Sequence, residues 1–208
     1  NSKGLSMDFS ANGKNEIFFV DGAEEALTRP QKEVMTSASA HYLECFDIRT
    51  EVDVYISKRS ILHTMVDNTL AWHMSPSYSG DNSIVCVFVD PDSSIKSMVK
   101  NLAHEMIHTW QVDRGDLKGR FWKGEDMAHL PYQYQPWEIE AYGQQDKVED
   151  YFYKDTLPSQ SELNEMCAKT DRVFSSIVEA AKSANLKEKL KTVAKVAAGV
   201  GLAVTLGI

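Results

Sequence analysis

Short apolar runs along the chain predict four strands. The segment 51–56 alternates polar with apolar positions, which is the pattern of a half-buried strand. The segment 69–74 has a similar pattern, and we expect it to lie beside the strand at 51–56. The segment 16–22 is typical of a strand and turn, and 83–89 is a β-branched run. Together these segments predict a small sheet.

Apolar positions three and four residues apart alternate with these runs and predict helices. The predicted helices span about 28–46, 95–113, 136–153 and 161–184. The second is apolar around much of its circumference, at Met98, Leu102 and Met106 among others, so we expect it to be largely buried. Turn and capping residues precede it, and it should end near Gly115. The order of helix, sheet and further helices predicts an α+β fold.

The buried helix carries the segment His104-Glu105-Met106-Ile107-His108. Residues four apart leave the same face of a helix, so His104 and His108 can bind one Zn²⁺. Glu105 is too close to them in sequence to be a third ligand, but it can take a proton from a water that the metal activates. Two histidines and a carboxylate on a buried helix need partners, which a metal supplies. The pattern is typical of a metallopeptidase.

A zinc site of this kind needs a third protein ligand. The metzincin extension requires glycine at 111 and histidine at 114, and the chain has Gln111 and Arg114, so that class is excluded. The remaining candidates are Glu138, Glu140 and His129. Glu138 is the favoured third ligand, and Glu140 and His129 remain open. Each candidate that does not bind the metal is expected to be a solvated surface group.

The segment around Glu138 resembles the ligand helix of the gluzincins. In that family the ligand glutamate is commonly followed three residues on by alanine and four on by aspartate or asparagine. Ala141 and Tyr142 stand at those positions. Residues three and four apart share a helix face, so both should face the metal helix if Glu138 does. Tyr142 departs from this pattern. The aspartate or asparagine of the family orients a ligand histidine through a hydrogen bond, so here the phenol of Tyr142 or another group would have to do so.

The resemblance implies a minimal zincin-like fold, in which a small β-sheet packs on the active-site helix and the glutamate helix. It implies Zn²⁺ on His104, His108 and Glu138, and hydrolysis of peptide bonds with Glu105 as general base. In such folds an edge strand before the metal helix binds extended peptide, and the segment 72–89 lies where that strand should be. A contrasting hypothesis is a zinc-binding structural or interaction protein without activity, for example a component of a phage particle.

A weaker resemblance is to SprT-like proteases, which act on proteins crosslinked to DNA and take a third histidine ligand after the metal helix. The segment 118–122 resembles theirs without its histidine, which keeps His129 open as a ligand. Over about 83–154 the chain is also broadly similar to small single-domain metallopeptidases, some of them phage-encoded. Between the two metal helices, the segment 113–135 is rich in aromatics and is either a lid over the metal or a packed loop. Tyr132 and Tyr134 of this segment, and Tyr142 of the following helix, are candidates to stabilise an oxyanion.

Composition narrows the remaining choices. The chain has 208 residues, which fits one catalytic domain at 1–158 and a C-terminal helical extension at 159–208. A formal net charge of −8 argues against a nucleic-acid surface, so we expect a protein or peptide substrate as the partner. Three cysteines far apart do not indicate a disulfide framework.

The end of the chain is uncharged over thirteen residues, 196–208. A bilayer span needs about 20 apolar residues, so this segment is too short for one. It is expected to be a docked helix, with a membrane or partner contact and the stump of a longer chain as alternatives. No secretory signal is visible, and the localisation is left open, with the cytoplasm or a virus particle as the options. The isolated histidines His41, His63 and His73 lack ligand spacing and are expected to be structural or surface groups.

Overall fold

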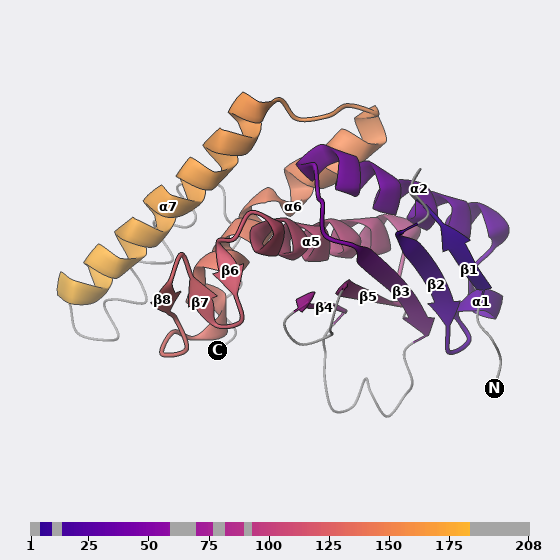
Figure 1. Cartoon of the computed structure of the whole chain (residues 1–208), viewed down its shortest axis with the longest axis horizontal. Coiled ribbons are helices and arrows are strands. Elements are labelled where there is room, and N and C mark those ends of the chain that lie inside the picture. Colours follow the sequence, from indigo (N-terminus) through magenta and orange to yellow (C-terminus); the bar gives the residue numbers. More distant parts are fainter. Residues whose placement is uncertain (1–4, 10–13, 59–69, 77–81, 90–92, 184–208) are drawn as a thin grey trace.

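A computed structural model describes residues 5–9, 14–58, 70–76, 82–89 and 93–183, and it confirms the α+β class. In the described parts a five-stranded mixed sheet carries helices on one face, and a small three-stranded sheet lies to one side (Figure 1). The strands are β1 (Leu5–Asp8), β2 (Glu16–Val20), β3 (Val52–Lys58), β4 (Ala71–Met74), β5 (Ser83–Val89), β6 (Leu117–Lys118), β7 (Phe121–Trp122) and β8 (Glu125–Asp126). The helices are α1 (Ala23–Ala26), α2 (Arg29–Phe46), α5 (Ile95–Asp113), η1 (Tyr132–Tyr134), α6 (Pro136–Lys154) and α7 (Gln160–Ser183).

The large sheet has the strand order β1-β2-β3-β5-β4. Strands β2, β3 and β5 are parallel, while β1 and β4 pair antiparallel at the two ends. The expectation that β4 lies beside β3 was therefore wrong, because β5 separates them. Strand β5 is buried at six of its seven positions, so it needs a neighbour on each side. Strand β4 alternates between partly buried and exposed positions, which suits an edge.

One face of the sheet forms the core beneath the helices. Alternate positions of β2, β3 and β5 are fully buried there, because successive side chains of a strand point to opposite faces. These residues are Ile17, Phe19, Val52, Val54, Ile56, Val85 and Val87. They belong to one cluster with Met35, Tyr42, Met98, Leu102 and Met106 of α2 and α5. The sheet and this helical layer together hold α5 in a fixed position.

Helix α5 has the bounds that its sequence predicted. The Ser94 hydroxyl accepts a hydrogen bond from the Ser97 amide at 3.0 Å and caps the N-terminus. At the other end Gly115 takes a φ of 82°, a left-handed conformation that stops the helix at low cost. Between these ends α5 is buried at nearly every position from Met98 to Gln111. The histidine motif therefore lies in the middle of a rigid, buried element.

The segment between α5 and α6 is a folded unit. Strands β6, β7 and β8 form an antiparallel meander within the segment that was expected to be either a lid over the metal or a packed loop. Trp122 packs beneath it against Leu117, Met127 and Trp137. The meander is thus anchored to the start of α6, and its residues Leu117 and Gly119 contribute to a pocket described below.

Helix α7 packs on the outer side of α6. Its residues Val173 and Ile177 form a small cluster with Tyr134 and Ile139. Lys123 of the meander makes an ion pair with Asp171 at 2.7 Å. The apolar segment 196–208 and His63 lie outside the described residues. A membrane-crossing helix, judged by length and apolar character, is not found in the described part of the chain.

Asp113 joins the end of α5 to the start of β3. One of its carboxylate oxygens accepts hydrogen bonds from the amides of Arg49 and Thr50, at 3.1 and 2.8 Å, and from the Thr50 hydroxyl at 2.6 Å. We expect Asp113→Ala to lower the free energy of unfolding by about 1–2 kcal/mol, because two backbone donors lose their acceptor. Urea denaturation measures this. Asp150→Ala, which removes the exposed ion pair with Lys154, is the control and should leave the free energy of unfolding nearly unchanged. Equal losses in the two variants would contradict the expectation.

Candidate metal centre

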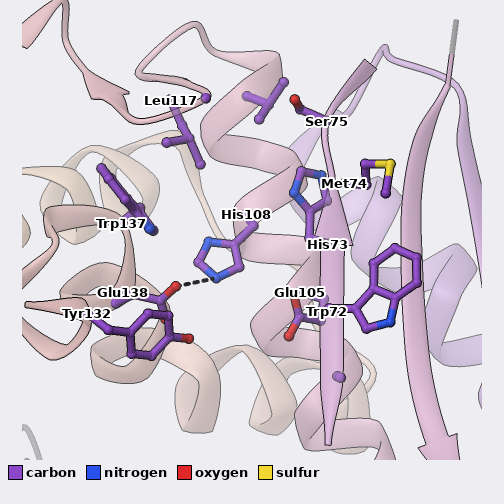
Figure 2. A pocket seen from close by; sticks show the side chains of 13 residues that line it. Trp72, His73, Met74, Ser75, Glu105, His108, Leu117, Tyr132, Trp137 and Glu138 are labelled. Carbon is purple, nitrogen blue, oxygen red and sulfur yellow. Dashed lines mark ion pairs between the residues drawn. The ribbon is translucent and has the colours of Figure 1, made fainter. Parts of the chain in front are cut away.

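Three side chains of the predicted site converge between α5 and α6. The Nε2 atom of His104 lies 3.4 Å from one carboxylate oxygen of Glu138, and the Nε2 atom of His108 lies 3.4 Å from the other. One possible ligand atom from each residue falls within 4.8 Å of the others. Figure 2 shows His108 and Glu138 facing each other across the gap between the two helices.

The geometry of these three residues fits a zinc ion. Tetrahedral coordination with bonds of about 2.0–2.1 Å separates neighbouring ligand atoms by about 3.3–3.4 Å. Each histidine Nε2 lies at that distance from one oxygen of the Glu138 carboxylate, a different oxygen for each histidine. All three side chains are buried, and Oε2 of Glu138 has no hydrogen-bond partner among the described residues. A buried carboxylate oxygen left without a partner is costly, and a cation at this position would satisfy it.

The electrostatics of the three residues are coupled. Burial lowers the pKa of His104, but the interaction with Glu138 and the charge of Glu105 outweigh it and raise that pKa. Burial raises the pKa of Glu138, yet both histidines outweigh it and the pKa is lowered. Burial dominates at His108, whose pKa is lowered. The carboxylate of Glu138 is therefore held in its ionised form, which is the form that binds a metal.

Glu105 lies beside this group and is only 6% exposed. Burial, reinforced by the charge of Glu138 and opposed by that of His104, raises its pKa to about 8. A cation held by the neighbouring residues would favour the ionised carboxylate instead. Glu105 also lines the pocket in front of His108 (Figure 2). It can therefore exchange a proton with a molecule bound there.

The other two candidates for the third ligand lie elsewhere. Glu140 points away from the histidines, as the helix geometry predicted, and pairs with Arg114. It is only 1% exposed, so the expectation that it would be a solvated surface group was wrong. His129 is exposed in the turn after β8 and is not in the group of converging ligand atoms. Glu138 is the candidate that the structure brings to the two histidines.

Two glutamines, whose role was not predicted from the sequence, contact the Nδ1 atoms of the two histidines, on the side of each ring away from Glu138. The Nδ1 atom of His108 lies 2.8 Å from Oε1 of Gln111, and Nδ1 of His104 lies 3.0 Å from Oε1 of Gln145. Their spacing carried a signal, since Gln111 follows His108 by three residues and Gln145 follows Glu138 by seven. Both positions are on the inward face of their helix.

The three tyrosines occupy different places. Tyr132 lines the pocket, and its hydroxyl interacts with the Glu138 carboxylate (Figure 2). Tyr142 faces the metal helix as expected, with its ring 4.5 Å from that of His104, edge to face. Tyr134 is buried in the cluster with α7 and does not line the pocket. Of the three, only Tyr132 presents its hydroxyl beside Glu138 in the pocket.

A pocket of about 400 Å³ opens in front of His108 and Glu138. Its walls come from β4, α5, the meander and the start of α6, with Trp72, Leu117, Tyr132 and Trp137 among the lining side chains (Figure 2). His73 of β4 lies in the same wall, its ring 6.2 Å from that of His108, and burial together with His108 lowers its pKa to about 3. His73 was expected to be a structural or surface group because it lacks ligand spacing, and it lines the pocket because β4 reaches the site through its pairing with β5.

Comparisons with known proteins give no further guide. No family model matches the chain, and neither the curated proteins nor the solved structures include a significant match.

Proposed function

We propose that the protein is a zinc-dependent metallopeptidase. The observation that carries the proposal is the convergence of His104, His108 and Glu138 beside a pocket that is lined by His108, Glu138 and Glu105. Two imidazoles and a carboxylate are the donor set of one common class of catalytic zinc site. A site built only to stabilise the fold would be closed, whereas this one faces a pocket large enough for a substrate segment.

Each residue has a distinct role in this proposal. His104, His108 and Glu138 hold the ion. A zinc ion in such a site supplies Lewis acidity, which makes water nucleophilic near neutral pH and polarises a carbonyl. Glu105 takes a proton from the attacking water and later gives it to the leaving amine. The hydroxyl of Tyr132 can donate a hydrogen bond to the oxygen that becomes negative during attack.

The substrate in this proposal is an extended peptide. Strand β4 ends the described sheet, and its residues Ala71 to Met74, together with Ser75, line the pocket. A peptide that added to the outer edge of β4 would cross in front of the histidines, with its backbone groups paired and its side chains in the pocket. The net charge of −8 gives no support to a DNA-associated role, so we keep the peptide as the sole substrate class.

Metal removal tests the function. We expect hydrolysis of an unstructured protein such as casein to stop when zinc is stripped with a strong chelator, and to return when one zinc per chain is restored. Zinc content by atomic emission and cleavage by mass spectrometry measure the two quantities on the same samples. Tight zinc binding by a chain that cleaves neither casein nor a peptide library would instead support the inactive zinc-binding protein.

A further inference from the structure

A row of buried polar side chains runs behind His108, away from the pocket. Gln111 is fully buried, and its amide nitrogen donates to the Trp137 carbonyl at 2.9 Å and to a Glu140 oxygen at 2.8 Å. Glu140 in turn accepts hydrogen bonds from Arg114 and from the Thr170 hydroxyl of α7, the latter at 3.3 Å. The row links the metal helix to both α6 and α7.

The partners of Gln111 fix the orientation of its amide. A backbone carbonyl and a carboxylate oxygen can only accept, so the NH₂ group of Gln111 must face them. Its oxygen then faces His108, where it can only accept as well. The Nδ1 atom of His108 must therefore carry a hydrogen. This leaves the lone pair of Nε2 free on the side that faces Glu138.

Glu140 cannot easily release Gln111. Its guanidinium partner Arg114 is held by Asp116 at 2.7 Å and lies over the Trp110 ring at 4.1 Å. The carboxylate of Glu140 is fully buried, while the Arg114 side chain is 16% exposed. With this guanidinium and a hydroxyl as partners, the carboxylate has a single favourable position. Because Glu140 is fixed, the amide of Gln111 is fixed as well.

We propose that Gln111, anchored by Glu140, is a positioning residue that holds His108 in the tautomer and orientation required to bind the metal through Nε2. The inference rests on the zinc site of the proposed function, but it concerns metal binding and does not require hydrolysis. It also gives a role to a glutamate that is close in sequence to Glu138 yet does not reach the metal.

The partner of the other histidine provides a matched control. The oxygen of Gln145 lies 3.0 Å from Nδ1 of His104, close to the 2.8 Å between Gln111 and His108. Gln145 is only partly buried, however, and its amide nitrogen donates no hydrogen bond to another described residue. Water can replace a partly exposed acceptor at little cost, and it cannot reach a fully buried one. The two glutamines should therefore differ in how much metal binding depends on them.

The first test compares Gln111→Met with Gln145→Met, since methionine keeps the length of the side chain and removes its hydrogen bonds. Zinc affinity is measured by competition with a chromophoric chelator. We expect Gln111→Met to weaken binding by about 10–100-fold, the usual cost of losing an outer partner of a ligand histidine. Gln145→Met should stay within about threefold, because water can take over. Equal losses in the two variants, or no loss in Gln111→Met, would overturn the proposal.

The second test reads the imidazole itself. In the zinc-loaded wild type, nitrogen-15 NMR should show a His108 Nδ1–H proton that exchanges slowly with water, because it donates to a buried oxygen. In Gln111→Met that proton should exchange at least about tenfold faster. A slow proton that persists in the variant overturns the positioning role. Unlike a change in activity, this signal reports on the hydrogen bond directly.

Two variants of Glu140 test the anchor and guard against general damage to the fold. One Glu140 oxygen accepts from both Gln111 and Arg114, and Glu140→Gln can keep an amide oxygen at that place, so zinc binding should stay within about threefold of wild type. Glu140→Met removes that acceptor, frees the amide of Gln111 to turn, and should weaken zinc binding by at least about tenfold. Equal zinc binding by the two variants would overturn the anchoring role of Glu140. A wild-type chain that binds no zinc would overturn both this inference and the proposed function.

Discussion

Glu138→Ala is expected to empty the metal site. Structural zinc in zinc-finger peptides is bound with about 10–16 kcal/mol shared among four ligands. By that measure, losing one of three protein ligands should weaken binding here by roughly a hundredfold or more. The two imidazoles would also lose the carboxylate that lies 3.4 Å from each. Zinc per chain after dialysis against a chelator that the wild type resists measures the effect.

His129→Ala is the matched control for that experiment, because His129 was the other ligand candidate outside α5 and is exposed in a turn. It should retain zinc like the wild type. Loss of zinc from His129→Ala, together with retention by Glu138→Ala, would place the protein with the three-histidine zincins. The similarity of the segment 118–122 to the SprT-like proteases would then regain its weight.

Glu105→Gln is expected to separate metal binding from hydrolysis. The amide has the shape of the carboxylate but cannot take a proton, so hydrolysis should fall by at least about a hundredfold. Zinc content should be unchanged, since Glu105 is not among the converging ligand atoms. Cleavage of casein or a peptide under saturating zinc, followed by mass spectrometry, measures the loss.

An exposed carboxylate in the neighbouring meander controls for nonspecific effects of charge. Glu125 of β8 is exposed, and Glu125→Gln should hydrolyse at the wild-type rate. Full activity in Glu105→Gln would remove the general-base mechanism. In that case the proton would have to be taken by another group of the pocket. His73 is a candidate, because it lines the pocket and burial lowers its pKa, which keeps the imidazole neutral.

Local signals in the sequence predicted much of this structure. Helix α5 was predicted with its observed bounds, because Ser94 caps its start, Gly115 stops it, and its apolar positions follow a helical period. Glu138 was favoured by the resemblance to the gluzincin ligand helix, and helix geometry agreed, since only that register turns Ala141 and Tyr142 toward α5. Ala141 is indeed fully buried and Tyr142 meets His104.

Features that depend on distant partners could not be predicted. The burial of Glu140 depends on Arg114, 26 positions earlier, and on Thr170, 30 positions later. The prediction of the strand order was wrong for a similar reason. The burial of β5 decides which strand pairs with β4, and no pattern within β4 itself indicates it. The two-residue strands β6 to β8 are too short to show a period.

The position of β4 at the end of the sheet has a consequence for substrate selection. A chain that pairs with β4 must offer several consecutive backbone N–H and C=O groups that nothing else has used. Helices and paired strands of a folded protein have already satisfied those groups internally. Under the proposed function, the folding state of a protein would govern its cleavage more than its residue sequence does. Native proteins would be cleaved only at loose ends and long loops. The same proteins would become substrates once they unfold.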